Sequence, residues 1–411
     1  MTQGSGLRDA YSATLARIKE QGGGKTRLAM QVLLWLSHSE RHLRVSELCN
    51  ALGVEIEPAN LHPENVPEIN TVLDCSLGLV TVEASSRIVR LIHPSLQEFL
   101  SNNTDLFHSP HLTIAQACLT YLHLPCIRDL SRNPGSPLRK TPLLGYTSCF
   151  WGTHLKRQIP ENVNPLALKL LSEFDKHVSS KVLLYHNPGN WDRELCLSNA
   201  AVFTGIHCAA YFGLIVNAVE LLEMKKWYLD ATDVEGNTAI SWAARKGHRE
   251  MVEMLLERED VTPDTADKDG RTPLSWAAGN GHEGIVAMLL KRTDVGSNTE
   301  DKDGRTPLSW AVERGHTRVV AILSGELLSA SQDAVISAST TQISLIPVSG
   351  KQRGGALKRR FEDLSSAPGS WGSNSPISLS PAESSEPSHR LFKKPRGSRD
   401  PQRTLPIRPA P

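Results

Sequence analysis

The sequence predicts a mostly α-helical protein that is organised around a solenoid of short helical repeats. The string DKDGRTPLSWA occurs at 267–277 and again at 301–311, and DVEGNTAISWA stands at 233–243, so the motif recurs every 34 residues. Upstream, residues 28–100 carry three helical segments and then an alternating hairpin pattern, and downstream 330–411 are rich in Ser, Pro and basic residues. Short repeats that cannot bury an apolar face alone must stack on their neighbours, which is how a solenoid forms.

Each repeat contains the signals for a turn and two helices. Asp-x-x-Gly supplies the turn, and Thr-Pro begins a helix because Pro fits the first helical turn. The first helix, LSWAAGN, ends near Gly281, and HEGIVAMLLKR forms a second helix with apolar residues at Ile285, Val286, Leu289 and Leu290.

The unit TPLSWAAGNGHEGIVAMLL resembles the ankyrin repeat, whose pattern is Thr-Pro-Leu-His-x-Ala-Ala followed by Gly-His. The resemblance covers 203–329 and implies four repeats, of which the end repeats are degenerate. Ser241, Ser275 and Ser309 stand where this family usually has His. The resemblance therefore implies that a hydrogen bond between repeats is altered or lost, and that the array binds a protein.

Residues 28–103 follow the order helix, helix, helix, hairpin. The helical segments are LAMQVLLWLSHS, VSELCNALGV and PEINTVLDC, and LGLVTVEASSRIVRLIH alternates around a turn at Ala84–Ser86, as hairpin strands do. Together with HPSLQEFLSN, this order resembles the winged-helix module that follows the nucleotide-binding domain in fungal NACHT-type (NOD-like) receptors, many of which end in ankyrin repeats. The resemblance implies an adaptor or recognition role in receptor-type signalling.

The other segments complete the predicted domain plan. We expect residues 1–27 to form a helix and a glycine linker, and 104–202 to form a helical bridge. Residues 330–411 are expected to be a disordered tail, since so few apolar residues cannot form a core. Between 331 and 411, twelve Lys and Arg against six Asp and Glu give a local charge of +6.

The motif GGGKT at 22–26 invites comparison with a phosphate-binding P-loop. That loop needs a Gly where this chain has Lys19, and a β-strand where it has the helical pattern AYSATLARIKEQ. The other interpretation, a glycine linker between two helices, is the one that we favour. No cofactor is expected.

A winged helix also raises the question of DNA binding. The third helix, which would enter the major groove, carries Glu68 and Asp74 and no basic residue, and residues 28–100 hold four Arg against nine Asp and Glu. A net charge of −5 repels phosphates. A structural or regulatory module is therefore the favoured interpretation.

Composition and motifs indicate no catalytic residue, no metal site and no membrane anchor. The whole chain carries 45 Lys and Arg against 44 Asp and Glu, and its longest apolar stretch is far below the ~18 residues that span a bilayer. The serines form no nucleophile elbow. The seven cysteines, never spaced as Cys-x-x-Cys, favour a reducing intracellular compartment, and no metal-ligand spacing links the histidines at 38, 42, 62, 93, 108, 111 and 123.

The tryptophans that recur in the repeats are candidate contact residues. On a helical wheel of ~100° per residue, Leu274, Ala277 and Ala278 share one face and Trp276 falls on the other. Either the three rings form a ladder on the concave surface, or each ring covers the alkyl stems of its neighbour's helix. The predicted partner-binding residues are the rings, the hairpin tips and the positions after the Ala pair: Trp242, Trp276, Trp310, Lys268, Asp269, Lys302, Asp303, Arg245, Lys246, Asn280, Glu313 and Arg314.

The sequence therefore predicts a protein-interaction module in the cytoplasm or the nucleus, without a small-molecule substrate. Two basic clusters are candidate nuclear signals: Lys358, Arg359 and Arg360, and Lys393, Lys394 and Arg396. The alternative function is a nuclear, nucleic-acid-associated regulator that uses the basic tail and the winged helix. Salt dependence separates the two, because binding to nucleic acid weakens steeply as salt is added.

Overall fold

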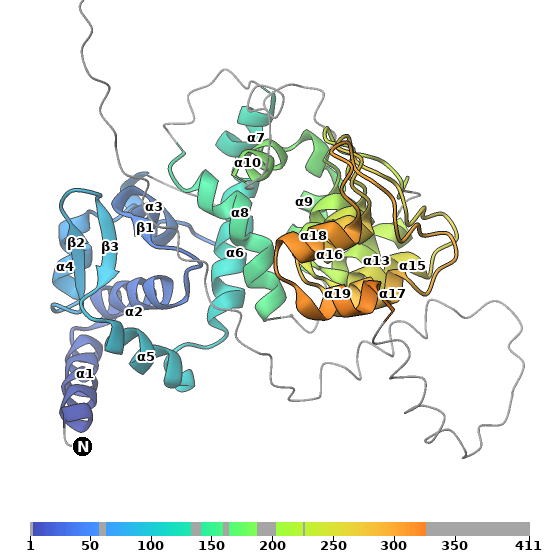
Figure 1. Cartoon of the computed structure of the whole chain (residues 1–411). Coiled ribbons are helices and arrows are strands. Elements are labelled where there is room, and N and C mark those ends of the chain that lie inside the picture. Colours follow the sequence, from blue (N-terminus) through green and yellow to red (C-terminus); the bar gives the residue numbers. More distant parts are fainter. Residues whose placement is uncertain are drawn as a thin grey trace, which may run out of the picture. The chain divides into compact units, whose positions relative to one another are not determined.

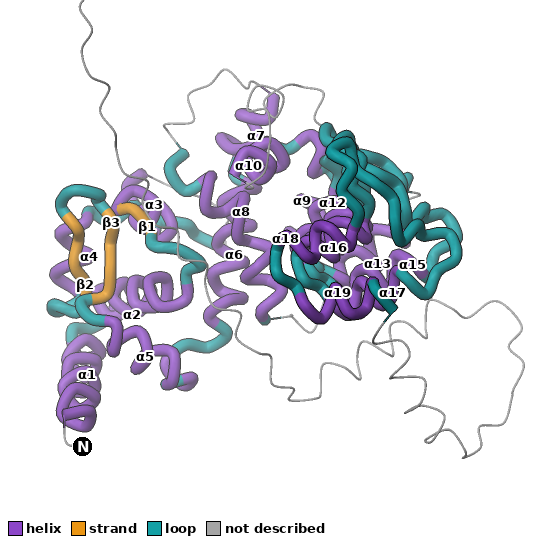
Figure 2. Tube along the Cα trace, in the orientation of Figure 1, coloured by secondary structure: helices purple, strands orange, loops and turns teal. Residues whose placement is uncertain are grey.

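The computed structural model describes residues 3–56, 63–132, 141–158, 164–186, 203–224 and 227–325. Helices dominate this part of the chain (Figure 1), and its strands belong to one small sheet (Figure 2). The mostly α fold class is confirmed. Among the described residues no helix is both long and apolar enough to cross a membrane. The tail from 330 onward and both of its basic clusters lie outside the described residues.

The glycine run at 22–24 joins two helices, α1 (Gln3–Glu20) and α2 (Gly23–His38). The predicted linker is shorter than expected, because α2 begins at Gly23 and the rest of GGGKT lies in its first turn. The Thr26 hydroxyl donates to the Ile18 carbonyl at 2.8 Å, which ties this turn to the end of α1. The two helices are separated only by Gln21 and Gly22, and Gly22 has a φ of 84°.

The winged-helix order is confirmed by a three-stranded antiparallel sheet with the order β1-β3-β2. The hairpin pairs Val80 with Leu91 and Glu83 with Ile88, and β1 pairs Leu43 with Val89. The sequence pattern did not reveal β1, because two residues are too few to show alternation. The elements are β1 (Leu43–Arg44), α3 (Val45–Leu52), η1 (Pro63–Asn65), α4 (Ile69–Cys75), β2 (Val80–Glu83), β3 (Ile88–Leu91), α5 (Pro94–Asn102) and η2 (Thr104–Leu106).

Helix α2 is the centre of this module. It packs against α3, α4, α5 and β3, and its Val32 and Leu33 are fully buried. Trp35, near its end, meets Tyr146 edge-on with ring centroids 5.9 Å apart. Tyr146 belongs to the next helical segment, so this aromatic pair joins the winged-helix module to it.

The predicted helical bridge consists, where described, of helices that pack around α6 and α8. Gly152 of α8 has no side chain, and a Cβ there would lie 2.4 Å from the Phe212 ring. This gap lets the first repeat helix approach α8 closely. The bridge elements are α6 (Pro110–His123), α7 (Pro125–Arg132), α8 (Leu144–Arg157), α9 (Pro165–Ser172), η4 (Phe174–Lys176) and α10 (Val178–His186).

Four helix pairs follow one another between 205 and 323 of the described residues. In Figure 2 the loops that connect successive pairs lie side by side, while the helices stack beside them. Thr238, Thr272 and Thr306 cap the first helices by accepting from a backbone N–H three residues later. The pairs are α12 (Gly205–Phe212) with α13 (Ile215–Met224), α14 (Ala239–Lys246) with α15 (Arg249–Leu256), α16 (Pro273–Gly279) with α17 (Glu283–Leu289), and α18 (Pro307–Glu313) with α19 (Thr317–Leu323).

Each first helix contacts the first helix of the neighbouring pair as well as its own second helix. The predicted Leu-Ala-Ala stripe is fully buried at Leu274, Ala277 and Ala278. Ile285, Val286 and Leu289 of α17 are buried with it. A continuous core therefore runs through the stack, as the repeat period predicts.

Candidate interaction surface

The loop before each of the helices α14, α16 and α18, here called a finger, is organised by one aspartate. The Oδ1 atom of Asp267 accepts hydrogen bonds from the backbone N–H groups of Asp269 and Arg271, both at 2.9 Å. Its Oδ2 accepts from the indole Nε1–H of Trp276 at 3.0 Å. One carboxylate therefore closes the turn and fixes the tryptophan at the same time.

The same arrangement recurs in the two neighbouring repeats. Trp242 donates to Asp233 at 2.8 Å, and Trp310 donates to Asp301 at 3.0 Å. In each repeat the Asp lies nine positions before the Trp. The three indoles are thus held in equivalent positions along the stack.

Arginine guanidinium groups fill the spaces between the rings. The Cζ atom of Arg245 lies 5.1 Å from the Trp242 ring centroid and 4.2 Å from that of Trp276. Arg271 lies 5.0 Å from the Trp276 ring and 4.6 Å from the Trp310 ring. These distances are typical of cation–π contacts. We call the alternating set of Trp242, Arg245, Trp276, Arg271 and Trp310 the Trp-Arg ladder.

The ladder is more buried than the helical wheel indicated. Trp242 has 0 % of its surface exposed and Trp310 has 6 %, while Trp276 is partly exposed. An exposed face is therefore wrong for two of the rings, because first helices pack against one another and bury a second side. The structure favours the other interpretation, in which each ring covers its neighbour's side chains. The contribution of the rings to partner binding stays a prediction.

The finger tips carry the exposed side chains that the sequence predicted. Consecutive fingers are joined by backbone hydrogen bonds of 2.8 Å, from Lys268 N to the Glu235 carbonyl and from Lys302 N to the Asp269 carbonyl. Because the backbone groups satisfy one another, the side chains can point to solvent. Those of Lys268, Asp269, Lys302 and Asp303 are exposed.

The positions after the Ala pair differ from repeat to repeat. Arg245 and Lys246 are half-buried, and burial, followed by the charge of Arg245, lowers the pKa of Lys246 to about 8. Asn280 is half-buried and donates to the Trp276 carbonyl at 2.8 Å. Glu313 and Arg314 are exposed. Glu313, Arg314 and the finger tips form the exposed part of the predicted surface.

Sequence reasoning missed two partners of the tryptophans, although a signal was present. The anchoring residues Asp233, Asp267 and Asp301 keep the same period as the rings, but they were considered only as turn residues. Arg271, and Arg305 at 3.9 Å from the Trp310 ring, follow their aspartates by four residues. That offset could have indicated a packed unit of Asp, Arg and Trp.

Histidines that follow the helix-ending glycines connect each repeat to the one before it. His248, His282 and His316 lie close to the carbonyl oxygens of Tyr211, Arg245 and Gly279, at 3.0, 3.2 and 3.1 Å. Ser275 instead bonds within its own repeat, to Thr272 at 3.2 Å. His207 occupies the position of Ser275 in the first helix pair, and its Nε2 lies 2.9 Å from the Ala231 carbonyl. At this position a histidine reaches the neighbouring repeat, whereas a serine such as Ser275 makes a hydrogen bond within its own repeat.

The geometry agrees with the comparisons with known families. Residues 175–265, 206–299 and 259–334 match the family model described as ankyrin repeats, in three copies. The stacked helix pairs are ankyrin repeats. The first match begins at 175, before the predicted start at 203. Residues 15–109 match the model described as the winged helix domain of GPI inositol-deacylase, and no curated protein matches the chain.

Proposed function

We propose that this chain is a protein-interaction module or adaptor whose ankyrin repeats bind a protein partner. The observation that carries the proposal is that buried and exposed positions of the repeats differ in how much they vary. The alanines that recur in the repeats, Ala243, Ala277 and Ala311, are buried, whereas the positions that follow the Ala pair differ from repeat to repeat. The charged finger tips and Glu313–Arg314 are exposed and held on a stacked backbone. A rigid scaffold that presents variable side chains is suited to selecting a protein surface.

We place the contact on the side of the fingers and the first helices, that is, on the concave face. The finger tips supply both charges, since Lys268 and Lys302 each stand beside an aspartate. The indole rings lie beneath the finger tips and support them. Trp276 is partly exposed, so it is the ring most available for contact. Mixed charges around an aromatic centre favour specificity for a protein over binding to a uniformly charged polymer.

Site-specific photo-crosslinking tests this placement. A photoreactive amino acid at Lys302 is expected to capture a protein that the same label at Lys291 does not capture. Both lysines are exposed, but Lys302 lies in a finger and Lys291 follows α17. Equal capture at both positions, or capture only at Lys291, would contradict the proposed face.

We also propose that recognition by this chain belongs to NOD-like receptor-type signalling. The support is the order of its parts, a winged-helix domain followed by ankyrin repeats, which resembles the C-terminal part of fungal NACHT receptors. Mass spectrometry of the product cross-linked at Lys302 tests this idea. A partner that contains a NACHT domain, or a ligand shared with such a receptor, is expected, and a partner without either connection would oppose it.

The proposed compartment is the cytoplasm or the nucleus, with the tail as the nuclear signal. Of its two clusters, Lys358–Arg360 is the simpler to remove. Replacing its three basic residues by Ala in a fluorescent fusion of the full chain should shift the protein toward the cytoplasm. Replacing Arg399 and Arg403, which lie outside both clusters, serves as the control. An unchanged distribution in every variant, including one that lacks both clusters, would remove the nuclear signal.

A further inference from the structure

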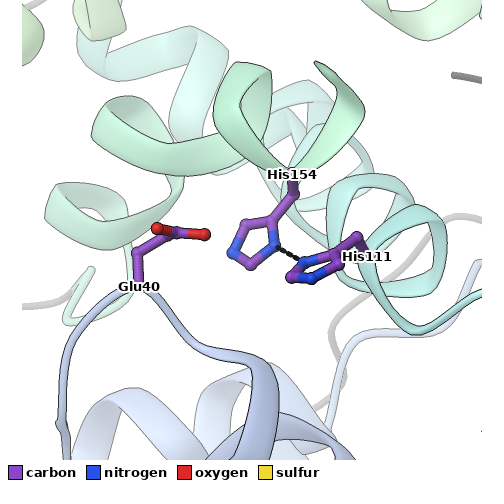
Figure 3. Close-up of side chains that lie close together, drawn as sticks. All are labelled: Glu40, His111 and His154. Carbon is purple, nitrogen blue, oxygen red and sulfur yellow. Dashed lines mark hydrogen bonds between the residues drawn. The ribbon is translucent and has the colours of Figure 1, made fainter. Parts of the chain in front are cut away.

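A cluster of two histidines and one glutamate lies where the winged-helix module meets the helical bridge. Glu40 follows α2, His111 lies in the first turn of α6, and His154 lies in the last turn of α8. One ligand atom from each side chain lies within 4.8 Å of those from the other two. Figure 3 shows the His154 ring between the Glu40 carboxylate and the His111 ring. Among the residues that the structure describes, this is the group whose donors suit a metal ion.

The two imidazoles face each other through equivalent atoms. Nδ1 of His111 lies 2.9 Å from Nδ1 of His154. Two bare nitrogen lone pairs repel at this distance, so something positive must lie between them, either a proton carried by one ring or a cation shared by both. Nε2 of His154 meets the Tyr146 hydroxyl at 2.8 Å. If Nε2 carries the proton, it donates to this hydroxyl oxygen, and Nδ1 is left as the nitrogen that can bind an ion.

The glutamate has one oxygen held and one oxygen available. Arg157 donates to Oε2 of Glu40 at 2.9 Å, whereas Oε1 is buried and has no hydrogen-bond partner. A buried carboxylate oxygen without a partner is unfavourable, and a bound cation would satisfy it. The Arg157 contact also fixes the carboxylate in the way that outer hydrogen bonds orient metal ligands.

We propose that Glu40, His111 and His154 form a binding site for a divalent transition-metal ion, with Zn²⁺ as the best match. Two imidazole nitrogens and one carboxylate oxygen form a donor set that Zn²⁺ takes, with a fourth position left for water. Bonds of about 2.0–2.2 Å in a tetrahedral site require donor atoms about 3.4 Å apart. The two Nδ1 atoms, 2.9 Å apart, would have to open by about 0.5 Å, and a donor as far away as 4.8 Å would have to close by about 1.4 Å. Rotation of the Glu40 side chain and the His154 ring would provide these shifts. This site opposes the expectation from the sequence that the chain binds no metal.

An ion at this site would connect the winged-helix module to the helical bridge. Glu40 belongs to the winged-helix module, and both histidines belong to the bridge. The described contacts across this junction include the Trp35–Tyr146 ring pair and the Arg157–Glu40 ion pair. A shared ion would add a further link, so binding should stabilise the junction as well as the site.

Zinc titration of the full chain tests the proposal. After removal of metals with a chelator, calorimetry is expected to show one equivalent of Zn²⁺ bound at pH 7 and a rise in the melting temperature. Glu40→Gln and His111→Gln should each weaken Zn²⁺ binding at least about tenfold and abolish the rise. His108→Gln is the matched control, because His108 is exposed and lies three residues from His111, and it should bind as the unmodified chain does.

Two results would overturn the site. If the full chain binds less than one equivalent of Zn²⁺, the cluster is a proton-sharing hydrogen-bond chain without an ion. If Glu40→Gln and His111→Gln bind Zn²⁺ as tightly as His108→Gln, the ion binds elsewhere. Glu40→Gln keeps the shape of the side chain, so it decides the question even if a histidine variant fails to fold. Cobalt spectra give an independent check, because tetrahedral Co²⁺ bound to His and Glu absorbs visible light and should lose that absorption in both ligand variants.

Discussion

The indole N–H of Trp242 donates to the carboxylate of Asp233 at 2.8 Å. The Trp242 side chain is completely buried, and Asp233 is only 5 % exposed. Oδ1 of the same aspartate accepts from the backbone N–H groups of Glu235 and Asn237, both at 2.9 Å. A single buried carboxylate thus links the shape of a finger to the packing of a first helix.

Removing the indole donor should destabilise the repeats. In Trp242→Phe, Oδ2 of the buried Asp233 loses its closest partner, which should lower the free energy of unfolding by about 1.5–3 kcal/mol. Trp276→Phe, whose ring is partly exposed, should lower it by less, because water can reach the Asp267 carboxylate more easily. Urea unfolding followed by tryptophan fluorescence and circular dichroism measures both variants. An equal loss in the two would show that burial does not set the strength of this bond.

Two glycines with the same backbone angle should respond differently to alanine. Gly247 and Gly315 have φ values of 76° and 73°, but a Cβ at Gly247 would lie 2.6 Å from the His282 ring, and one at Gly315 would meet nothing within 4 Å. Gly315→Ala should cost about 1 kcal/mol from left-handed backbone strain alone. Gly247→Ala should cost about 2–4 kcal/mol, because the ring must also move and its contact with Arg245 weakens. Melting temperatures rank the variants, and the reverse order would contradict the packing of His282.

The repeats should lose stability as the pH falls below neutral. Lys156 donates to Nδ1 of His248 at 2.8 Å, and Nε2 lies 3.0 Å from the Tyr211 carbonyl. Burial, followed by the charge of Lys156, lowers the pKa of His248 to about 3. The unfolded chain therefore takes up this proton near pH 6.5, while the folded chain resists it until about pH 3. The stability that neutral His248 contributes is present above pH 6.5 and is lost as the pH falls toward 3.

Denaturant unfolding between pH 7 and pH 4 measures this effect. His248→Gln should reduce the loss of stability across the window, by an amount on the order of 2–3 kcal/mol. His316→Gln is the control, since it removes an equivalent contact, that to the Gly279 carbonyl at 3.1 Å, from the last repeat. Should both variants keep the slope of the unmodified chain, His248 is not the group that senses acid.

The arginine between two rings should matter more than an arginine at the surface. Arg271 lies between Trp276 and Trp310, and its Nε is 3.8 Å from Asp301 in the next repeat. Arg271→Met, which keeps an alkyl chain but removes the charge, should cost about 1–2 kcal/mol. Arg271→Lys should not restore this loss, because a compact ammonium cannot stack between two rings as a planar guanidinium does.

Arg258→Met provides the comparison, since Arg258 pairs with Asp260 at 2.9 Å and both side chains are well exposed. An exposed pair of this kind contributes at most about 1 kcal/mol. Thermal unfolding of the three variants checks the order. A larger loss in Arg258→Met than in Arg271→Met would mean that the Trp-Arg ladder does not stabilise the stack.

The period of 34 residues and the Thr-Pro, Gly-His and Leu-Ala-Ala signals were enough to predict the repeat array. These signals act locally: a capping Thr or a helix-ending Gly shapes the backbone within a few residues. The hairpin of β2 and β3 could be predicted for the same reason, because alternation along a strand is also a local signal. The predicted domain boundaries depend in part on segments outside the described residues, and they stay predictions.

The burial of the tryptophans and the Glu40–His111–His154 cluster were decided only by the tertiary structure. A helical wheel describes one helix, whereas Trp242 is buried by Tyr211, whose ring lies 5.4 Å away on the preceding first helix. His111 and His154 stand 43 positions apart without a repeat to relate them, and they meet because α6 packs along α8. Contacts between distant segments depend on how whole helices pack, and no short pattern in the sequence encodes that packing.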